Sequence, residues 1–130
     1  MAYHVHAPQV ANLRVYCEEW SQPPMAAGNW VPDIVELAGG KSGIVQAGTL
    51  SRTYEFSELQ SFDPHVAILH ICGMGAKPKP ESLQTRPGWE QIRAVRDNRV
   101  HVLDDSLLNR PTSRLFLGLK QIKDIVTSYN

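Results

Sequence analysis

The sequence has no excess of charge of either sign and no long apolar run. Among its 130 residues, Lys and Arg number 13 and so do Asp and Glu, which leaves a formal net charge of zero at pH 7. Nucleic acids and anionic membrane surfaces are bound through basic faces, so we expect neither as a partner. No apolar stretch approaches the roughly 20 residues that a membrane-spanning helix needs, so we expect no such helix.

Cysteine and histidine are also sparse. The two cysteines, Cys17 and Cys72, are too few for a disulfide framework, and we predict that each is a small buried apolar side chain. The five histidines are scattered along the chain: His4, His6, His65, His70 and His101. None has the spacing of a structural zinc site, and only His4 and His6 are close enough to hold a metal adventitiously. We therefore expect no metal site and no required cofactor.

Residues 1–12 lack the basic start and apolar centre of an export signal. We predict that this stretch is a leader or linker remnant and that residues 13–130 form one domain. A chain of this length buries about two-thirds of the surface that its unfolded form exposes. If the chain is complete, the missing export signal predicts a cytoplasmic protein.

Strand patterns and helical patterns alternate along residues 13–130. The strand patterns lie at residues 13–17, 44–47, 65–71 and 99–104. The helical patterns lie at residues 31–38, 57–62, 89–95 and 115–126. We predict Asn29 and Ser57 as the N-caps of the first two helices and Trp89 as a core residue. Such alternation requires parallel strands joined by helical crossovers, so the sequence predicts the α/β fold class with a roughly four-stranded parallel sheet.

The loop at residues 18–30 is the strongest candidate for a binding surface. It follows a strand and precedes a helix, and such loops lie at the carboxyl edge of a parallel sheet, where α/β folds bind ligands. The loop carries Trp20 and Trp30 beside a pair of prolines, and large apolar groups in a connecting segment suggest a contact surface. The alternative is that both indoles pack against the domain's own core.

Motifs for nucleotide binding or catalysis are weak. No glycine-rich phosphate-binding motif of the Rossmann or P-loop type is present. Glu18 and Glu19 are adjacent in an extended stretch and point to opposite sides, so they cannot easily act as an acid–base pair. We expect no catalytic residues. A small enzyme that uses Cys72 is the alternative, but the sequence supplies no base paired with its thiol.

Several short stretches share the order and spacing of one known family. They are Glu19-Trp20 with Pro23-Pro24, Gly28–Asp33, Glu36–Gly40, Ser61–Val66, Cys72–Met74 and Arg110–Arg114. Together they resemble the C-terminal lobe of the cobalamin-type substrate-binding proteins of ABC importers, over about Leu13 to Ile125. The chain departs from the family pattern at His65, where the family has Asp, and at Thr112 and Ser113, where the family has Gly and Pro.

The resemblance implies a function without catalysis. Such proteins hold a ligand between two Rossmann-like lobes, so it implies a three-layer Rossmann-like domain that is one such lobe. The implied ligand is cobalamin or a related corrinoid, and the alternatives are a siderophore, haem or metal-chelate ligand, or a single-lobe protein-interaction domain. The implied partners are an ABC transporter permease and a second copy of the chain across the exposed cleft face. A lobe of an exported protein would be periplasmic or extracellular.

The resemblance also implies roles for individual residues. The implied ligand-binding residues are Trp20, Met25, Asn29, Trp30, Tyr54, Gly73, Met74 and Arg110. The aromatic rings and Met25 would offer flat apolar area to a macrocycle, while Asn29 and Arg110 would meet its polar groups. Family members dock on the transporter through a surface glutamate, and Glu58, or else Glu55, is the candidate. Arg110 as a brace for its loop and Glu58 as a solvated helix residue are the alternatives.

Overall fold

The computed structural model describes residues 12–129 and contains one five-stranded sheet. Its strands are β1 (Val15–Ser21), β2 (Pro24–Ala26), β3 (Arg52–Thr53), β4 (Val66–Leu69) and β5 (Val100–Val102), in the spatial order β3-β2-β1-β4-β5. β1, β4 and β5 are parallel, whereas β2 pairs antiparallel with β1 and β3 pairs antiparallel with β2. The expectations for residues 1–11, including a metal at His4 and His6, lie outside the described residues.

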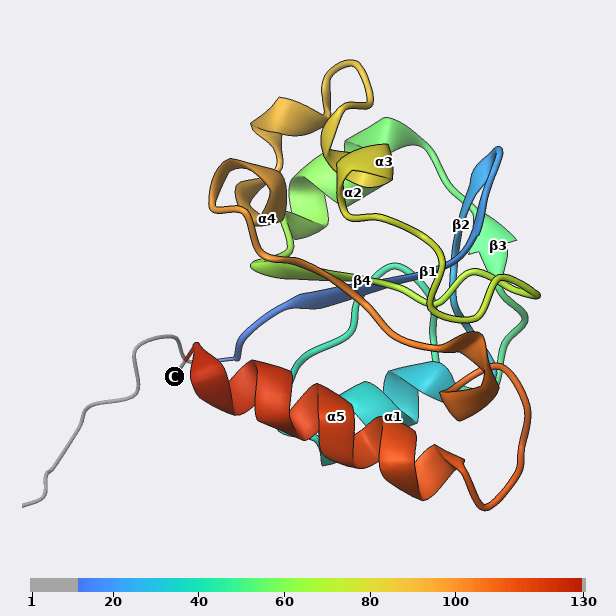
Figure 1. The fold of residues 1–130 in the computed structure, drawn as a ribbon. Helices are drawn as coiled ribbons and strands as arrows, with labels where there is room; N and C mark the ends of the chain where they lie inside the picture. The colour runs from blue at the N-terminus through green and yellow to red at the C-terminus, as the bar shows by residue number, and fades with distance from the viewer. Residues whose placement is uncertain (1–11, 130) are drawn as a thin grey trace, which may run out of the picture.

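Helices cover both faces of the sheet (Figure 1). One face carries α1 (Val31–Leu37) and α5 (Leu115–Ser128), together with the 3₁₀ turn η2 (Asp105–Leu107). The other face carries α2 (Phe56–Phe62), α3 (Glu81–Gln84), the 3₁₀ turn η1 (Trp89–Gln91) and α4 (Arg93–Arg96). The predicted three-layer α/β class is therefore confirmed, with Trp89 buried as predicted. No helix in the described part of the chain is long and apolar enough to cross a membrane.

The alternation of side chains along β1 builds two separate cores. Val15 and Cys17 point into the core beneath α1 and α5, while Tyr16 points into the core beneath α2 and η1. β4 is buried on both faces along its whole length, as its continuous apolar run predicts. Because β4 is the middle strand of the parallel trio, it fixes where the loops after β1 and β5 meet.

The predicted strand at residues 44–47 is wrong. This segment is irregular, although Val45 is buried. The place next to β1 is taken instead by β2, because the chain turns back at Gln22-Pro23 and pairs Trp20 with Met25. The prediction treated residues 18–30 as a loop, yet a proline is compatible with the first residue of a strand. The sheet is thus mixed at one edge rather than wholly parallel.

The two predicted N-caps are also wrong, each by a residue or two. Asn29 adopts a left-handed φ of 55°, and Trp30 is the N-cap of α1 without a side-chain cap hydrogen bond. α2 starts before Ser57, with Glu55 as its N-cap and a capping box between Glu55 and Glu58. Glu55 rather than Ser57 caps the helix because two hydrogen bonds form: the Glu55 side chain accepts from the Glu58 backbone N–H, and the Glu58 side chain accepts from the Glu55 backbone N–H.

Candidate functional site

The carboxyl ends of β1, β4 and β5 bring three segments together at one edge of the sheet. The backbone N–H of Cys72 donates to the Glu19 carbonyl at 2.9 Å, which places the segment after β4 beside β1. The Asp105 carboxylate accepts from Gly73 and Gly75, which joins the segment after β5 to the same place. We call residues 20–25, 72–76 and 105–110 the carboxyl rim.

A groove of about 800 Å³ opens between the β1–β2 turn, the segment after β4 and α3. Its lining residues are Glu18, Ser21, Gln22, Pro24, Leu69, Ile71, Met74, Lys77, Pro78, Lys79, Glu81, Ser82, Thr85, Arg86, Pro87 and Trp89. Sites for small molecules and cofactors span roughly 300 to 1,000 Å³ and are mostly apolar with a few polar groups. The groove has that size and that mixture, so it is the candidate ligand site.

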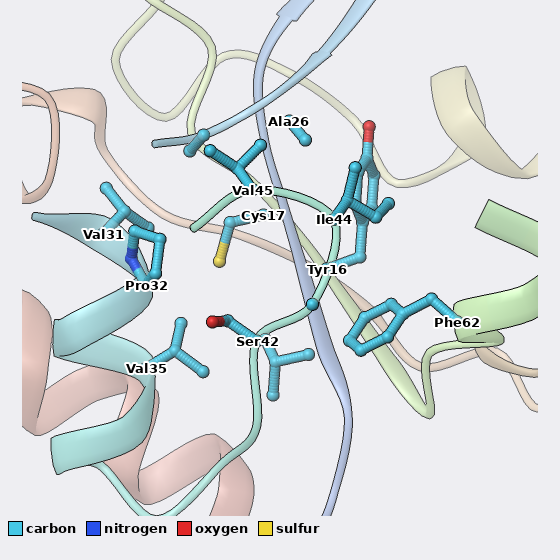
Figure 2. Close-up of a pocket in the computed structure, with 13 residues that line it drawn as sticks. Tyr16, Cys17, Ala26, Val31, Pro32, Val35, Ser42, Ile44, Val45 and Phe62 are labelled. Carbon is cyan, nitrogen blue, oxygen red and sulfur yellow. The ribbon is translucent and has the colours of Figure 1, made fainter. Parts of the chain in front are cut away.

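A second cavity, between α1 and residues 42–45, is too small for a ligand. Figure 2 shows the Cys17 side chain directed into it, with Val31, Pro32 and Val35 of α1 around it. Its volume is about 20 Å³, close to the least that holds one water molecule. Burial raises the pKa of the Cys17 thiol to about 12, so this cysteine is inert, as its predicted core role requires.

A buried ion pair forms the polar floor of the groove. Arg86 donates from Nη1 to Glu18 Oε1 at 2.8 Å and from Nη2 to Oε2 at 2.6 Å. Glu18 is completely buried, whereas the Arg86 side chain keeps 16% of its exposure. Such a two-pronged pair is geometrically specific, and the buried carboxylate is expensive to leave unpaired. Glu18 therefore fixes the position of Arg86 in the groove.

Two tyrosines extend this network away from the groove. The Tyr16 hydroxyl donates to Glu18 Oε1 at 2.6 Å, so the hydrogen bond between the Tyr16 and Tyr54 hydroxyls has Tyr54 as donor. Burial, reinforced by the Glu18 charge, raises the pKa of Tyr16 well above its usual value. Burial acts to lower the pKa of Arg86, but the hydrogen bonds and charge of Glu18 outweigh it and the pKa is raised. The pKa of Tyr54 is raised by burial as well, so both tyrosine hydroxyls and the Arg86 guanidinium keep their protons near neutral pH.

His70, at the end of β4, holds the segment after β5 in place. Its Nδ1 bonds to Asn109 Oδ1, while Asn109 Nδ2 donates to the His70 carbonyl at 3.1 Å. Because Asn109 donates from its nitrogen, Nδ1 of His70 must carry the proton and Nε2 is the bare nitrogen. Nε2 is buried and has no hydrogen-bond partner within residues 12–129. Burial lowers the pKa of His70 to about 4.

Five of the predicted ligand-binding residues lie on the carboxyl rim. Trp20 is 47% exposed and Met74 is 42% exposed, and Met25 pairs with Trp20 across the β1–β2 turn. Gly73 sits beside Met74, and Arg110 is exposed after Asn109. Among these residues, only Met74 lines the groove itself. Trp20 precedes Ser21 and Gln22, which line the groove, and its indole N–H donates to the Gln22 carbonyl at 3.2 Å.

The other predicted ligand-binding residues are engaged inside the molecule. The Trp30 indole donates to the Leu108 carbonyl at 2.6 Å and packs on the core beneath α1 and α5. The Tyr54 hydroxyl belongs to the Glu18 network, and the backbone of Asn29 bonds to that of Thr49. Their roles toward a ligand stay predictions, whereas their contacts within the fold are defined.

The structure places the remaining candidates as follows. Glu58 pairs with Arg52 at 2.8 Å on the surface of α2, next to Glu55.

Cys72 is exposed, so the prediction that it is a buried side chain is wrong. Its backbone makes the last hydrogen bond from this segment to β1, but the buried apolar run ends one residue earlier, at Ile71, which explains the error. Within residues 12–129, no group of His, Cys, Asp or Glu could hold a metal ion.

The sequence interpretation missed the roles of Glu18 and Arg86 in the groove and of Asp105 and Asn109 in the carboxyl rim. A signal for Glu18 existed, because a carboxylate inside an apolar strand pattern must find a buried partner. Tyr16 and Glu18 are two residues apart on one strand and so share a face. The identity of the partner, Arg86, depends on tertiary contacts across a separation of 68 residues.

A family model and several solved structures all match this chain to periplasmic binding proteins. A family model described as "Periplasmic binding protein" matches residues 11–107, more than half of the chain. A possible iron-binding, periplasmic solute-binding protein from Staphylococcus epidermidis superimposes with a TM-score of 0.72 and 23% identity, over 88% of this chain and 45% of that one. No curated protein matches the chain.

Two further structures bind different ligands. The periplasmic vitamin B12 binding protein of Vibrio cholerae gives a TM-score of 0.68 and 16% identity, over 90% of this chain and 45% of that one. The periplasmic heme-binding protein BhuT, in complex with two hemes, gives 0.77 and 20%, over 94% of this chain and 47% of that one. These likenesses show the fold, and the chain spans less than half the length of each structure.

Proposed function

Because the chain belongs to the periplasmic binding protein family, a family of solute-binding proteins, we propose that it is one ligand-binding lobe of such a protein. The observation that carries this proposal is the large groove at the carboxyl edge of the parallel strands. Ligands of open α/β sheets bind at this edge. The exposed Trp20 and Met74 beside the groove add apolar area that a ligand would cover.

We propose cobalamin or a related corrinoid as the ligand. A corrinoid is a wide macrocycle with many amide arms, so it needs apolar area together with scattered hydrogen-bond donors. The rim offers such area at Trp20, Met25 and Met74, and a donor at Arg110. Asn29, Trp30, Tyr54 and Gly73 complete the set of ligand-binding residues proposed on the family resemblance.

The second candidate is a ligand with carboxylates, such as haem, or an iron chelate. The specific observation that favours it is the charge of the groove lining, where Lys77, Lys79 and Arg86 outweigh Glu18 and Glu81. Since Glu18 is already paired with Arg86, the lysines leave the groove mouth favourable for an anionic group.

We propose two partners: an ABC transporter permease, and a second lobe or a second copy of the chain that packs against the carboxyl rim. Glu58, or else Glu55, would meet an ABC transporter permease from the surface of α2. A second lobe, or a second copy of the chain, would face the carboxyl rim and complete the ligand site. We propose that the protein acts in the periplasm or outside the cell, as its family does.

Calorimetric titration with cyanocobalamin, hemin and a ferric hydroxamate tests the proposal. We expect saturable binding of at least one of them, strongest for cyanocobalamin, and a weaker affinity for Trp20→Ala because its exposed ring would lose contact area with the macrocycle. Leu37→Ala is the matched control, since Leu37 is 72% exposed at the far end of α1. Equal loss in both variants, or no binding of any of the three, would contradict the proposal.

A further inference from the structure

Arg86 is held firmly in the groove, but its hydrogen-bonding capacity is not used up. Glu18 binds the outer end of the guanidinium at 2.8 and 2.6 Å. One face of the guanidinium lies over the Trp89 ring, 4.6 Å from its centroid. These contacts fix the plane and direction of the group, so Arg86 loses little conformational freedom when it binds something else.

Arg86 lines the groove and has donors that the pair with Glu18 leaves unused. A guanidinium carries five N–H groups, and the pair with Glu18 consumes only some of them. Within residues 12–129, the Arg86 side chain has no other hydrogen-bond acceptor. Arg86 lines the groove and its side chain keeps 16% of its exposure, so water reaches part of this side chain. A ligand that displaces this water without offering an acceptor would lose affinity.

We propose that Arg86 is a ligand-recognition residue, held in place by Glu18, that donates its remaining N–H groups to the oxygen of a carboxylate or amide arm on the ligand. This inference rests on the proposed function only in taking the groove as the ligand site. It assigns to the groove a ligand whose arms end in sp² oxygens, and it assigns Glu18 the role of a positioning residue that does not touch the ligand.

The chemistry of the surroundings favours this class of ligand. A fixed, planar guanidinium matches the geometry of sp² oxygens better than a flexible ammonium does. The Glu18 charge offsets that of Arg86, so an uncharged amide is acceptable at the floor. Lys77 and Lys79 also line the groove, which makes a carboxylate acceptable as well. A purely apolar ligand would leave the Arg86 donors unpaired.

Side-chain NMR of the isotope-labelled chain tests the inference with small probes. Sodium propionate supplies the carboxylate arm and propionamide supplies the amide arm, at constant ionic strength. We expect a saturable shift of the Arg86 Nε–H resonance with at least one probe, and only weak, linear shifts for Arg96, which is exposed on α4. The probe that binds tells which kind of arm the groove accepts. If Arg86 shifts no more than Arg96 with either probe, the inference is overturned.

A conservative substitution separates recognition from a merely structural role. Arg86→Lys keeps a cation next to Glu18 but lacks the planar group, so we expect the probe affinity, followed at the Trp89 indole N–H, to fall about tenfold or more. Arg96→Lys is the matched control and should leave the affinity unchanged. Unchanged affinity in a folded Arg86→Lys protein would overturn the inference, and the wild-type titration stands by itself if that variant does not fold.

The small probes also keep this inference apart from the proposed function. If propionate or propionamide saturates Arg86 while cyanocobalamin, hemin and the ferric hydroxamate all fail to bind, the groove chemistry is upheld and the proposed function is wrong. If a macrocycle binds while Arg86 responds to neither probe, the proposed function is upheld and the role of Arg86 is wrong.

Discussion

At the scale of single residues, one buried carboxylate organises the candidate site. Glu18 accepts from Arg86 and from Tyr16, and it has no exposed surface. Taking a carboxylate out of water is costly unless its partners are well aligned. An apolar pair of similar volume at the groove would often make the fold as stable or more stable than this charged pair does. This arrangement is understandable if the position of Arg86 matters for binding.

Removing the Glu18 charge tests how much stability depends on the pair. Glu18→Gln leaves Arg86 partly buried without a counter-charge, so we expect the free energy of unfolding to fall by about 3 kcal/mol. Urea denaturation measures this value. Glu36→Gln, on the exposed side of α1, is the matched control and should change it little. If Glu18→Gln lowers the free energy of unfolding no more than Glu36→Gln does, the Glu18–Arg86 pair is exposed to water and the expected dependence on burial is wrong.

His70 makes stability depend on pH in a defined direction. Its pKa is about 4 in the fold, against an ordinary value of 6.5, so between these values the unfolded chain binds more protons. Stability from this residue is therefore complete above about pH 7 and falls as the pH drops. We expect a loss of about 2 kcal/mol between pH 8 and pH 5 from His70 alone.

Imidazole titration by NMR checks this directly. The His70 ring should stay neutral at pH 5 with the proton on Nδ1, because Nδ1 donates to Asn109. His101, which is half-buried, also has a lowered pKa because of burial, and it provides an internal comparison in the same sample. A His70 ring that titrates near 6.5 would show that the buried, unpartnered Nε2 is accessible to water.

At the scale of elements, the segments after β4 and β5 are tied together by one side chain. Asp105 accepts from the N–H of Gly73 at 2.8 Å and from that of Gly75 at 3.0 Å. Both glycines have positive φ, of 78° and 57°, a conformation that glycine adopts without strain, and their N–H groups meet the same carboxylate while the Met74 N–H between them donates to the Ile71 carbonyl. The Asp105 carboxylate thus fixes the segment that carries Met74.

Removing this carboxylate should loosen the rim without unfolding the domain. In Asp105→Ala we expect hydrogen exchange at Gly73 and Gly75 to accelerate several-fold, because both N–H groups lose their acceptor. Exchange in β4 should not change. Asp97→Ala, at an exposed turn, is the control. Unchanged exchange at both glycines in Asp105→Ala would show that Asp105 does not hold this segment.

The position of α5 depends on a close approach at Gly118. A Cβ there would lie 2.6 Å from the Leu107 carbonyl oxygen and 2.9 Å from Leu108 Cδ2. Although Ala favours a helix by about 1 kcal/mol over Gly, overpacking costs more here, so we expect Gly118→Ala to lose about 2 kcal/mol of unfolding free energy. Gln121→Ala, exposed on the same helix, is the control for urea denaturation. A stabilised Gly118→Ala protein would show that α5 can shift away from η2.

At the scale of the whole molecule, local patterns predict the layers but not every strand. The run at residues 13–17 overlaps the start of β1, and the runs at 65–71 and 99–104 contain β4 and β5, because buried strands leave a continuous apolar signature. The helices that end at Asp63 and begin near Leu115 follow from helix-ending and periodicity rules. The short strands β2 and β3 form because they pair with their neighbours in the sheet. They are three and two residues long, which is too short for a strand pattern to be recognised in the sequence.

The candidate site is predictable in place but not in detail. The carboxyl edge follows from topology, and Trp20, Met74 and Arg110 lie there, while their roles toward a ligand stay predictions. Trp30 is turned toward Leu108, and the Glu18–Arg86 pair was not foreseen, because side-chain partners far apart in sequence depend on the assembled fold. Local patterns alone do not determine which of two tryptophans on one segment faces outward.

Chemical-shift mapping with cyanocobalamin tests the central claim, that the groove and the carboxyl rim form the ligand site, most directly. We predict saturable changes at the Trp20 indole N–H, at residues 72–76 and at Arg86 and Trp89, while the far end of α1 and the last turns of α5 stay unchanged. Changes confined to the α1 and α5 face, or no saturable change with cyanocobalamin, hemin or a ferric hydroxamate, would contradict the claim.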